Sequence, residues 1–117
     1  MAVDEGALRE LSSADVVAFG AVGFAASTLP VTRAYQRLAE ALGGEVDLRP
    51  HLDRLLAEGT PAGKAYAATL LDKLDHDAGR AAWRSLATDR AEITTFTGCL
   101  MNRTTLAEYA ADRLRSG

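Results

Sequence analysis

The residues with the chemistry to attack a carbonyl or phosphoryl group are one cysteine and two histidines. Cys99 follows Gly98, while His51 and His76 stand elsewhere in the chain. A thiolate that an imidazole activates, with Asp75 or Asp77 to orient the ring, forms a nucleophilic site. One cysteine and two histidines without a local signature occur together in many proteins, and a lone cysteine is typical of a small buried side chain. We therefore predict a structural Cys99 and no enzymatic activity.

The densest group of charges lies around His76 and consists of Asp72, Asp75 and Asp77. A hard cation needs several oxygen ligands that converge on one point. The spacing lacks the glycine and the terminal glutamate of an EF-hand loop, so we expect no metal site and no cofactor. The pattern favours a solvated acidic turn that also caps the following helix. Because Asp72 and Asp75 are three residues apart and can share a helix face, this turn is our candidate surface for a basic partner protein.

A second charged group contains Arg80, Arg84 and Arg90 beside Trp83. Helical spacing places Arg80 and Arg84 on one face, where we expect solvated ion pairs. The chain has a net charge of −3, an isoelectric point near 5.3 and only 6% aromatic residues. A chain of this composition is not expected to bind nucleic acid through general electrostatic attraction.

The chain that positions these residues has the size and composition of one helical domain. It has 117 residues and a mass of 12.4 kDa, and it is 48% hydrophobic and 25% charged. These values exclude a disordered protein, and the excess of alanine favours helices over sheets. A single cysteine excludes an internal disulfide framework. We expect one domain over residues 1–117.

The most apolar stretch of the chain covers residues 16–26. It is too short to cross a bilayer, and the acidic residues before it are unlike a secretory leader. We therefore predict a buried helix over residues 14–27 in a cytoplasmic protein that does not bind membranes. Gly20 and Gly23 inside this stretch favour close packing against another helix, with a ligand-binding loop as the alternative.

Capping residues and apolar stripes predict five further helices. Their expected starts are Thr32, Asp47, Thr60, Asp75 or Asp77, and Thr105. The fourth helix of the chain, after Thr60, is apolar on most sides and should be central. Residues 92–101 are β-branched in part and predict an extended segment, which must pair within the chain or with another chain. The predicted fold is a mainly α, single-domain bundle of about six helices in HEAT-like antiparallel hairpins.

A resemblance covers about half of the chain, from Gly59 to Gly117. It rests on the run GTPAGKAYAATLL, on a later TGC and on the closing TLAEYAADRL. These segments resemble a group of small helical proteins of bacteria to which no activity is assigned. The resemblance implies a helical fold and transfers no catalytic residue.

Three functions from different classes fit these observations. The first is a non-catalytic module that binds another protein, for example a bacterial immunity protein that neutralises a basic toxin domain. The second is a regulatory domain that binds a small molecule in a pocket lined by Gly20–Gly23, Tyr35 and Tyr66. The third is an enzyme that uses Cys99 and a histidine. Small size, mild acidity and the lack of a credible catalytic set favour the first.

Overall fold

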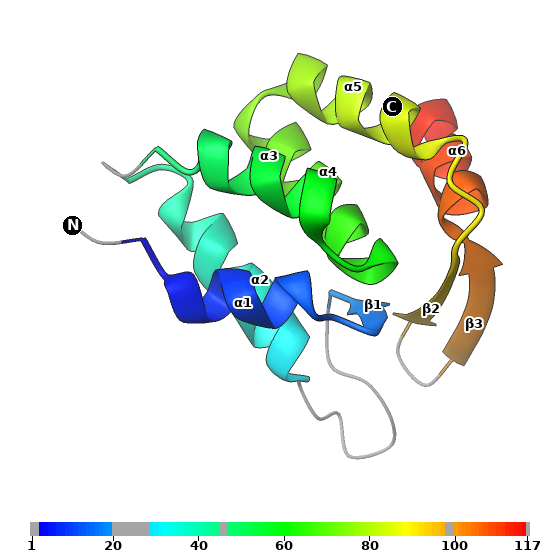
Figure 1. Ribbon diagram of the computed structural model, residues 1–117, viewed down its shortest axis with the longest axis horizontal. Coiled ribbons are helices and arrows are strands. Elements are labelled where there is room, and N and C mark those ends of the chain that lie inside the picture. The colour runs from blue at the N-terminus through cyan, green and yellow to red at the C-terminus, as the bar shows by residue number, and fades with distance from the viewer. Residues whose placement is uncertain (1–2, 20–28, 45–46, 98–99, 117) are drawn as a thin grey trace.

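The computed structural model describes residues 3–19, 29–44, 47–97 and 100–116, and every structural statement below refers to these residues. They form a mainly helical, compact fold with a small sheet at one end (Figure 1). The elements, in chain order, are α1 (Glu5–Ser12), β1 (Val16–Ala18), α2 (Pro30–Ala41), α3 (Arg49–Glu58), α4 (Pro61–Leu74), α5 (His76–Leu86), β2 (Glu92–Thr97), β3 (Leu100–Thr105) and α6 (Leu106–Ser116).

Helix α4 lies at the centre of the core, as its apolar sequence predicts. Eight of its residues are buried, and the helix packs against α3 and α5 as well as against α1, α2, α6 and the sheet. Tyr66, Leu70 and Leu71 supply its largest buried side chains. Thr60 caps the helix by accepting a hydrogen bond from the Gly63 N–H, and Pro61 occupies the first turn.

The prediction of one helix over residues 14–27 is wrong for residues 16–18, which form β1. Val16 and Val17 are β-branched, and β1 pairs in parallel with β2, with Val17 opposite Thr95. This long-range pairing outweighs the local helix signal. Residues 14, 15 and 19 are not helical either, and residues 20–27, which include Gly20 and Gly23, lie outside the described residues.

Helix α1 is an element that the sequence reasoning missed. Asp4 caps it by accepting a hydrogen bond of 2.9 Å from the Ala7 N–H. This bond, and after it the Arg37 side chain, hold the pKa of Asp4 below its ordinary value. Ser12 is the last residue of α1.

The other helix starts were predicted to within three residues. Thr32 was expected to cap α2, but the helix begins at Pro30 after Leu29. The buried Thr32 side chain instead donates a hydrogen bond to the Ala18 carbonyl. Helix α3 follows Asp47, which accepts a hydrogen bond from the Arg49 N–H. Thr105 caps α6 by accepting a hydrogen bond from the Glu108 N–H at 3.1 Å.

The predicted extended segment pairs within the chain on both of its sides. The strand order is β1-β2-β3, with β1 parallel and β3 antiparallel to β2. The extended structure continues beyond residue 101 to Thr105, so β3 is an edge strand that immediately precedes α6. None of the helices in the described part of the chain is long and apolar enough to cross a membrane.

Candidate functional site

The histidines considered for catalysis occupy different surroundings. His76, at the start of α5, lies with its Nδ1 at 2.9 Å from Asp72 Oδ1. His51 belongs to α3 and faces a groove against α1. Cys99 lies outside the described residues. Among the residues that the structure describes, no group of three or more histidine, aspartate or glutamate side chains is placed to hold a metal ion.

The three aspartates of the candidate partner surface meet at the junction of α4 and α5, and two of them have partners within the chain. Asp72 bonds His76, and Asp75 Oδ2 lies 3.9 Å from Arg49 Nη1. Asp75 also caps α5 by accepting a hydrogen bond of 3.0 Å from the Asp77 N–H. The capping residue is therefore Asp75, and Asp77 lies exposed in the first turn of α5.

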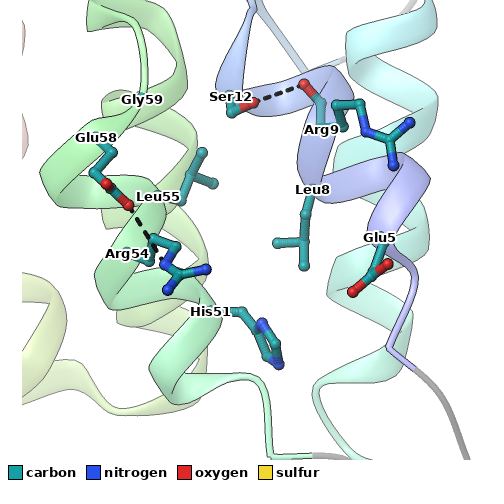
Figure 2. A pocket seen from close by; sticks show the side chains of 9 residues that line it. All are labelled: Glu5, Leu8, Arg9, Ser12, His51, Arg54, Leu55, Glu58 and Gly59. Atoms are coloured by element: carbon teal, nitrogen blue, oxygen red, sulfur yellow. Dashed lines mark hydrogen bonds and ion pairs between the residues drawn. The ribbon is translucent and has the colours of Figure 1, made fainter.

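A groove of about 550 Å³ separates α1 from α3 (Figure 2). Leu8 and Leu55 contribute apolar surface to it, and charged side chains of both signs line the remainder. The residues that line it are Glu5, Leu8, Arg9, Ser12, His51, Arg54, Leu55, Glu58 and Gly59. Arg54 pairs with Glu58 at 3.4 Å on the same helix. Because the lining has no excess of one charge, it specifies no ligand class.

The sheet is tied to the helical body through Ala18 at the end of β1. The Tyr66 hydroxyl accepts a hydrogen bond from the Ala18 N–H and donates one to the Ala18 carbonyl, both at 2.8 Å. Thr32 Oγ1 donates to the same carbonyl at 2.6 Å. Burial raises the pKa of Tyr66 to about 12, so the phenol keeps its proton near neutral pH. These bonds hold the sheet in place on α2 and α4.

The edge of the sheet farthest from β1 is formed by β3. It carries the most exposed large apolar side chains in the described part of the chain. Leu100 is 68% exposed and Met101 is 61% exposed, whereas Leu74 on α4, the third of this kind, is 38% exposed. Leu100 and Met101 begin β3, the edge strand. Exposed apolar side chains on a strand whose outer edge is unpaired are typical of a surface that adds another strand.

The register of the sheet shows which backbone groups of β3 point away from β2. Opposite residues in an antiparallel pair alternate between exchanging hydrogen bonds and pointing outward. The Leu106 N–H donates to the Ala91 carbonyl at 2.8 Å, which makes this pair a bonded one. Counting back along the register, the N–H and C=O groups of Met101 and Arg103 face outward. We call the outward backbone groups of Met101 and Arg103, with the Leu100 and Met101 side chains, the β3 edge.

The β3 edge lies partly beyond the segment that the sequence reasoning identified. The β-branched run after Glu92 predicted an extended segment to residue 101, but Asn102 and Arg103 lack that signal. Their strand conformation comes from the register with Thr94 and Thr95 on β2. The exposed pair Leu100–Met101 was the signal in the sequence that could have located the edge.

The chain was also compared with known proteins. Searches against protein-family models, curated proteins and solved structures each found no match. The function must therefore be inferred from the chain's own residues.

Proposed function

We propose that this chain is a non-catalytic protein-binding module and that its partner adds a strand to the β3 edge. The observation that carries the proposal is the exposure of Leu100 and Met101 on an edge strand whose outward backbone groups are available. Strand addition gains affinity from main-chain hydrogen bonds and specificity from alternate side chains. The sheet is fixed through Ala18 to α2 and α4, so the edge is already ordered before a partner arrives.

The make-up of β3 supports this interpretation. Natural edge strands avoid unwanted pairing through lysine, proline, bulges or inward-pointing charges. The strand Leu100–Thr105 has no proline or lysine, and Arg103 is its one charged residue. An edge of six residues with two exposed apolar side chains is therefore suited to pairing.

A more specific form of the proposal concerns the biological role. We infer a cytoplasmic protein of bacterial type that acts as an immunity protein against a toxin domain. We also propose that α3, α4 and α5 form HEAT-like antiparallel hairpins, and the packing of α4 against both α3 and α5 supports this proposal. The net charge of −3 supports a basic partner, since complementary charge accelerates association. In this form of the proposal the acidic turn of Asp72, Asp75 and Asp77 steers the partner.

The test of the proposed function blocks hydrogen bonding at the β3 edge. Met101→Pro removes an N–H that points away from β2, and proline is tolerated on edge strands, so the hairpin should survive. We expect Met101→Pro to lose the proteins that the wild type captures from its host, as identified by mass spectrometry. The control Leu74→Ser removes an exposed apolar side chain on α4 and should keep them.

A second variant keeps this test decisive if the proline disturbs the fold. Met101→Lys leaves the backbone intact and places a charge on the edge, a natural protection against strand pairing. Unchanged capture by folded Met101→Lys and Met101→Pro variants would refute strand addition by a host protein at β3.

The acidic turn makes a separate prediction about association rates. Reversing Asp72 and Asp77 to lysine should slow association with a basic partner, and the loss should shrink as salt is raised, because exposed charges are screened beyond about 8 Å at physiological ionic strength. Asp75 is left unchanged because it caps α5. The measurement is the association rate against ionic strength.

The matched control for this prediction changes the net charge equally. Reversing the exposed Glu10 and Glu40 adds the same positive charge at helices α1 and α2. Equal slowing in both double variants would show that only total charge matters, and the acidic turn would then have no specific role in binding.

A further inference from the structure

We propose that the strand added to the β3 edge comes from a second copy of this chain, which pairs antiparallel about a two-fold axis at Asn102. The inference rests on the proposed function, because it names the partner of the same edge. Each copy contributes a sheet of three strands, so the dimer contains one continuous sheet of six. Such an interface is isologous, with the same surface on both copies.

The outward backbone groups select the register of this pairing. In each copy the groups of Met101 and Arg103 face outward, two residues apart. With Asn102 on the axis, Met101 of one copy lies opposite Arg103 of the other. Met101 and Arg103 of each strand then exchange their hydrogen bonds, in two bonded pairs, whereas Thr105, which faces outward by the same alternation, remains beside its own α6.

The neighbouring symmetric registers are less favourable because of the residues that they place opposite each other. An axis at Arg103 places two arginines directly opposite each other, which is unfavourable for like charges. It also involves Thr105, which already caps α6 and adjoins that helix. An axis at Met101 leaves Arg103 without an opposite residue in the described part of β3.

The register with Asn102 on the axis also covers the two exposed apolar side chains. Directly opposite residues share a face of the sheet. Within its own chain Met101 lies opposite Phe96 on β2. In the dimer it also contacts the aliphatic part of the second copy's Arg103, on the side away from β2. Leu100 gains the second copy's Thr104 in the same way. The two Asn102 amides meet at the axis, where each can donate to and accept from the other.

The charges on β3 itself permit this contact. Arg103 is the one charged residue of each β3 strand, and in this register it lies opposite Met101 of the second copy rather than opposite a like charge. The acidic turn between α4 and α5 lies away from β3 (Figure 1), so dimer formation leaves it accessible to another partner.

The experiment traps the register with a disulfide. In a Cys99→Ser background, Asn102→Cys places one thiol per chain at the axis, where opposite non-bonded residues have Cα atoms about 4.5 Å apart, within disulfide range. Mild oxidation should shift the mass from 12.4 kDa to twice that value on a non-reducing gel. The control is Arg103→Cys, since the two Arg103 positions lie diagonally, about 7–8 Å apart, and should not link.

Sedimentation of the unlinked wild type provides the second readout. The wild type should show a monomer–dimer equilibrium that Met101→Pro shifts to the monomer. Cross-linking through Arg103→Cys but not Asn102→Cys would overturn the register proposed here.

The failure of this inference is distinguishable from failure of the proposed function. In one outcome, the wild type stays monomeric at high concentration and Met101→Pro abolishes the capture of a host protein. This outcome would overturn the second copy as partner and support strand addition by another protein. A monomeric wild type whose capture of host proteins is unaffected by Met101→Pro would overturn both.

Discussion

Replacing Leu70 by alanine is expected to lower the free energy of unfolding by about 2–5 kcal/mol. Leu70 is fully buried in α4, the helix on which the other helices and the sheet pack. The truncation removes apolar contacts and leaves a cavity among neighbours that are themselves held by the surrounding elements. Urea unfolding, followed by far-UV circular dichroism at constant pH, measures the change.

A matched substitution in the same helix controls for helix propensity and side-chain chemistry. Leu74 lies at the end of α4 and is 38% exposed. Leu74→Ala should therefore cost clearly less than Leu70→Ala, because less area returns to water. A loss below about 1 kcal/mol for Leu70→Ala would mean that the site collapses freely, in contradiction to a tightly packed central helix.

Replacing Gly79 by alanine is expected to destabilise the fold by about 1–3 kcal/mol. Helices α4 and α5 approach so closely here that a Cβ on Gly79 would overlap Cα and Cβ of Asp72. The backbone of one helix must then move, which also disturbs the turn capped by Asp75. Alanine improves helix propensity by up to about 1 kcal/mol, but the clash with backbone atoms is the larger effect.

The control for this prediction is the same substitution in an open position. Gly6 lies exposed on α1, and a Cβ there would meet only the Asp4 side chain at 3.5 Å. Gly6→Ala should therefore leave the stability unchanged or raise it by up to about 1 kcal/mol. Thermal unfolding of both variants gives the comparison, and a stabilising Gly79→Ala would contradict the close approach of α4 and α5.

Local signals in the sequence were sufficient for the helices of the second half of the chain. Thr60 followed by Pro61 marks the start of α4, and Asp75 marks the start of α5. Caps and apolar stripes act within one or two helical turns, so they are visible without knowledge of the fold. The same reasoning located Thr105 at the start of α6.

The first 20 residues were predicted less well because long-range contacts decide their structure. The apolar run after Asp15 has a composition that suits a buried helix or a buried strand equally. Its partners are Thr94 and Thr95 on β2 and the Tyr66 hydroxyl on α4, all far along the chain. None of these contacts leaves a local mark in the sequence of β1.

The candidate surfaces were recognised from the sequence in part. The acidic turn is where the spacing placed it. The partner of Asp72 is His76, four residues along the chain, whereas Arg49, the partner of Asp75, depends on the packing of α3 against α4. The groove between α1 and α3 was missed because α1 was not predicted. Similarly, the β3 edge required the register of β2 with β3, which follows from the hairpin as a whole.

The most direct measurement of the central claim is residue-resolved amide hydrogen exchange in β3 as the protein concentration is raised. The N–H groups of Met101 and Arg103 face away from β2, whereas those of Asn102 and Thr104 face toward it. Pairing across the β3 edge predicts that exchange at Met101 and Arg103 slows with increasing concentration, while Asn102 and Thr104 change much less. Exchange at Met101 and Arg103 that stays fast at every concentration would contradict pairing of β3 with a second copy.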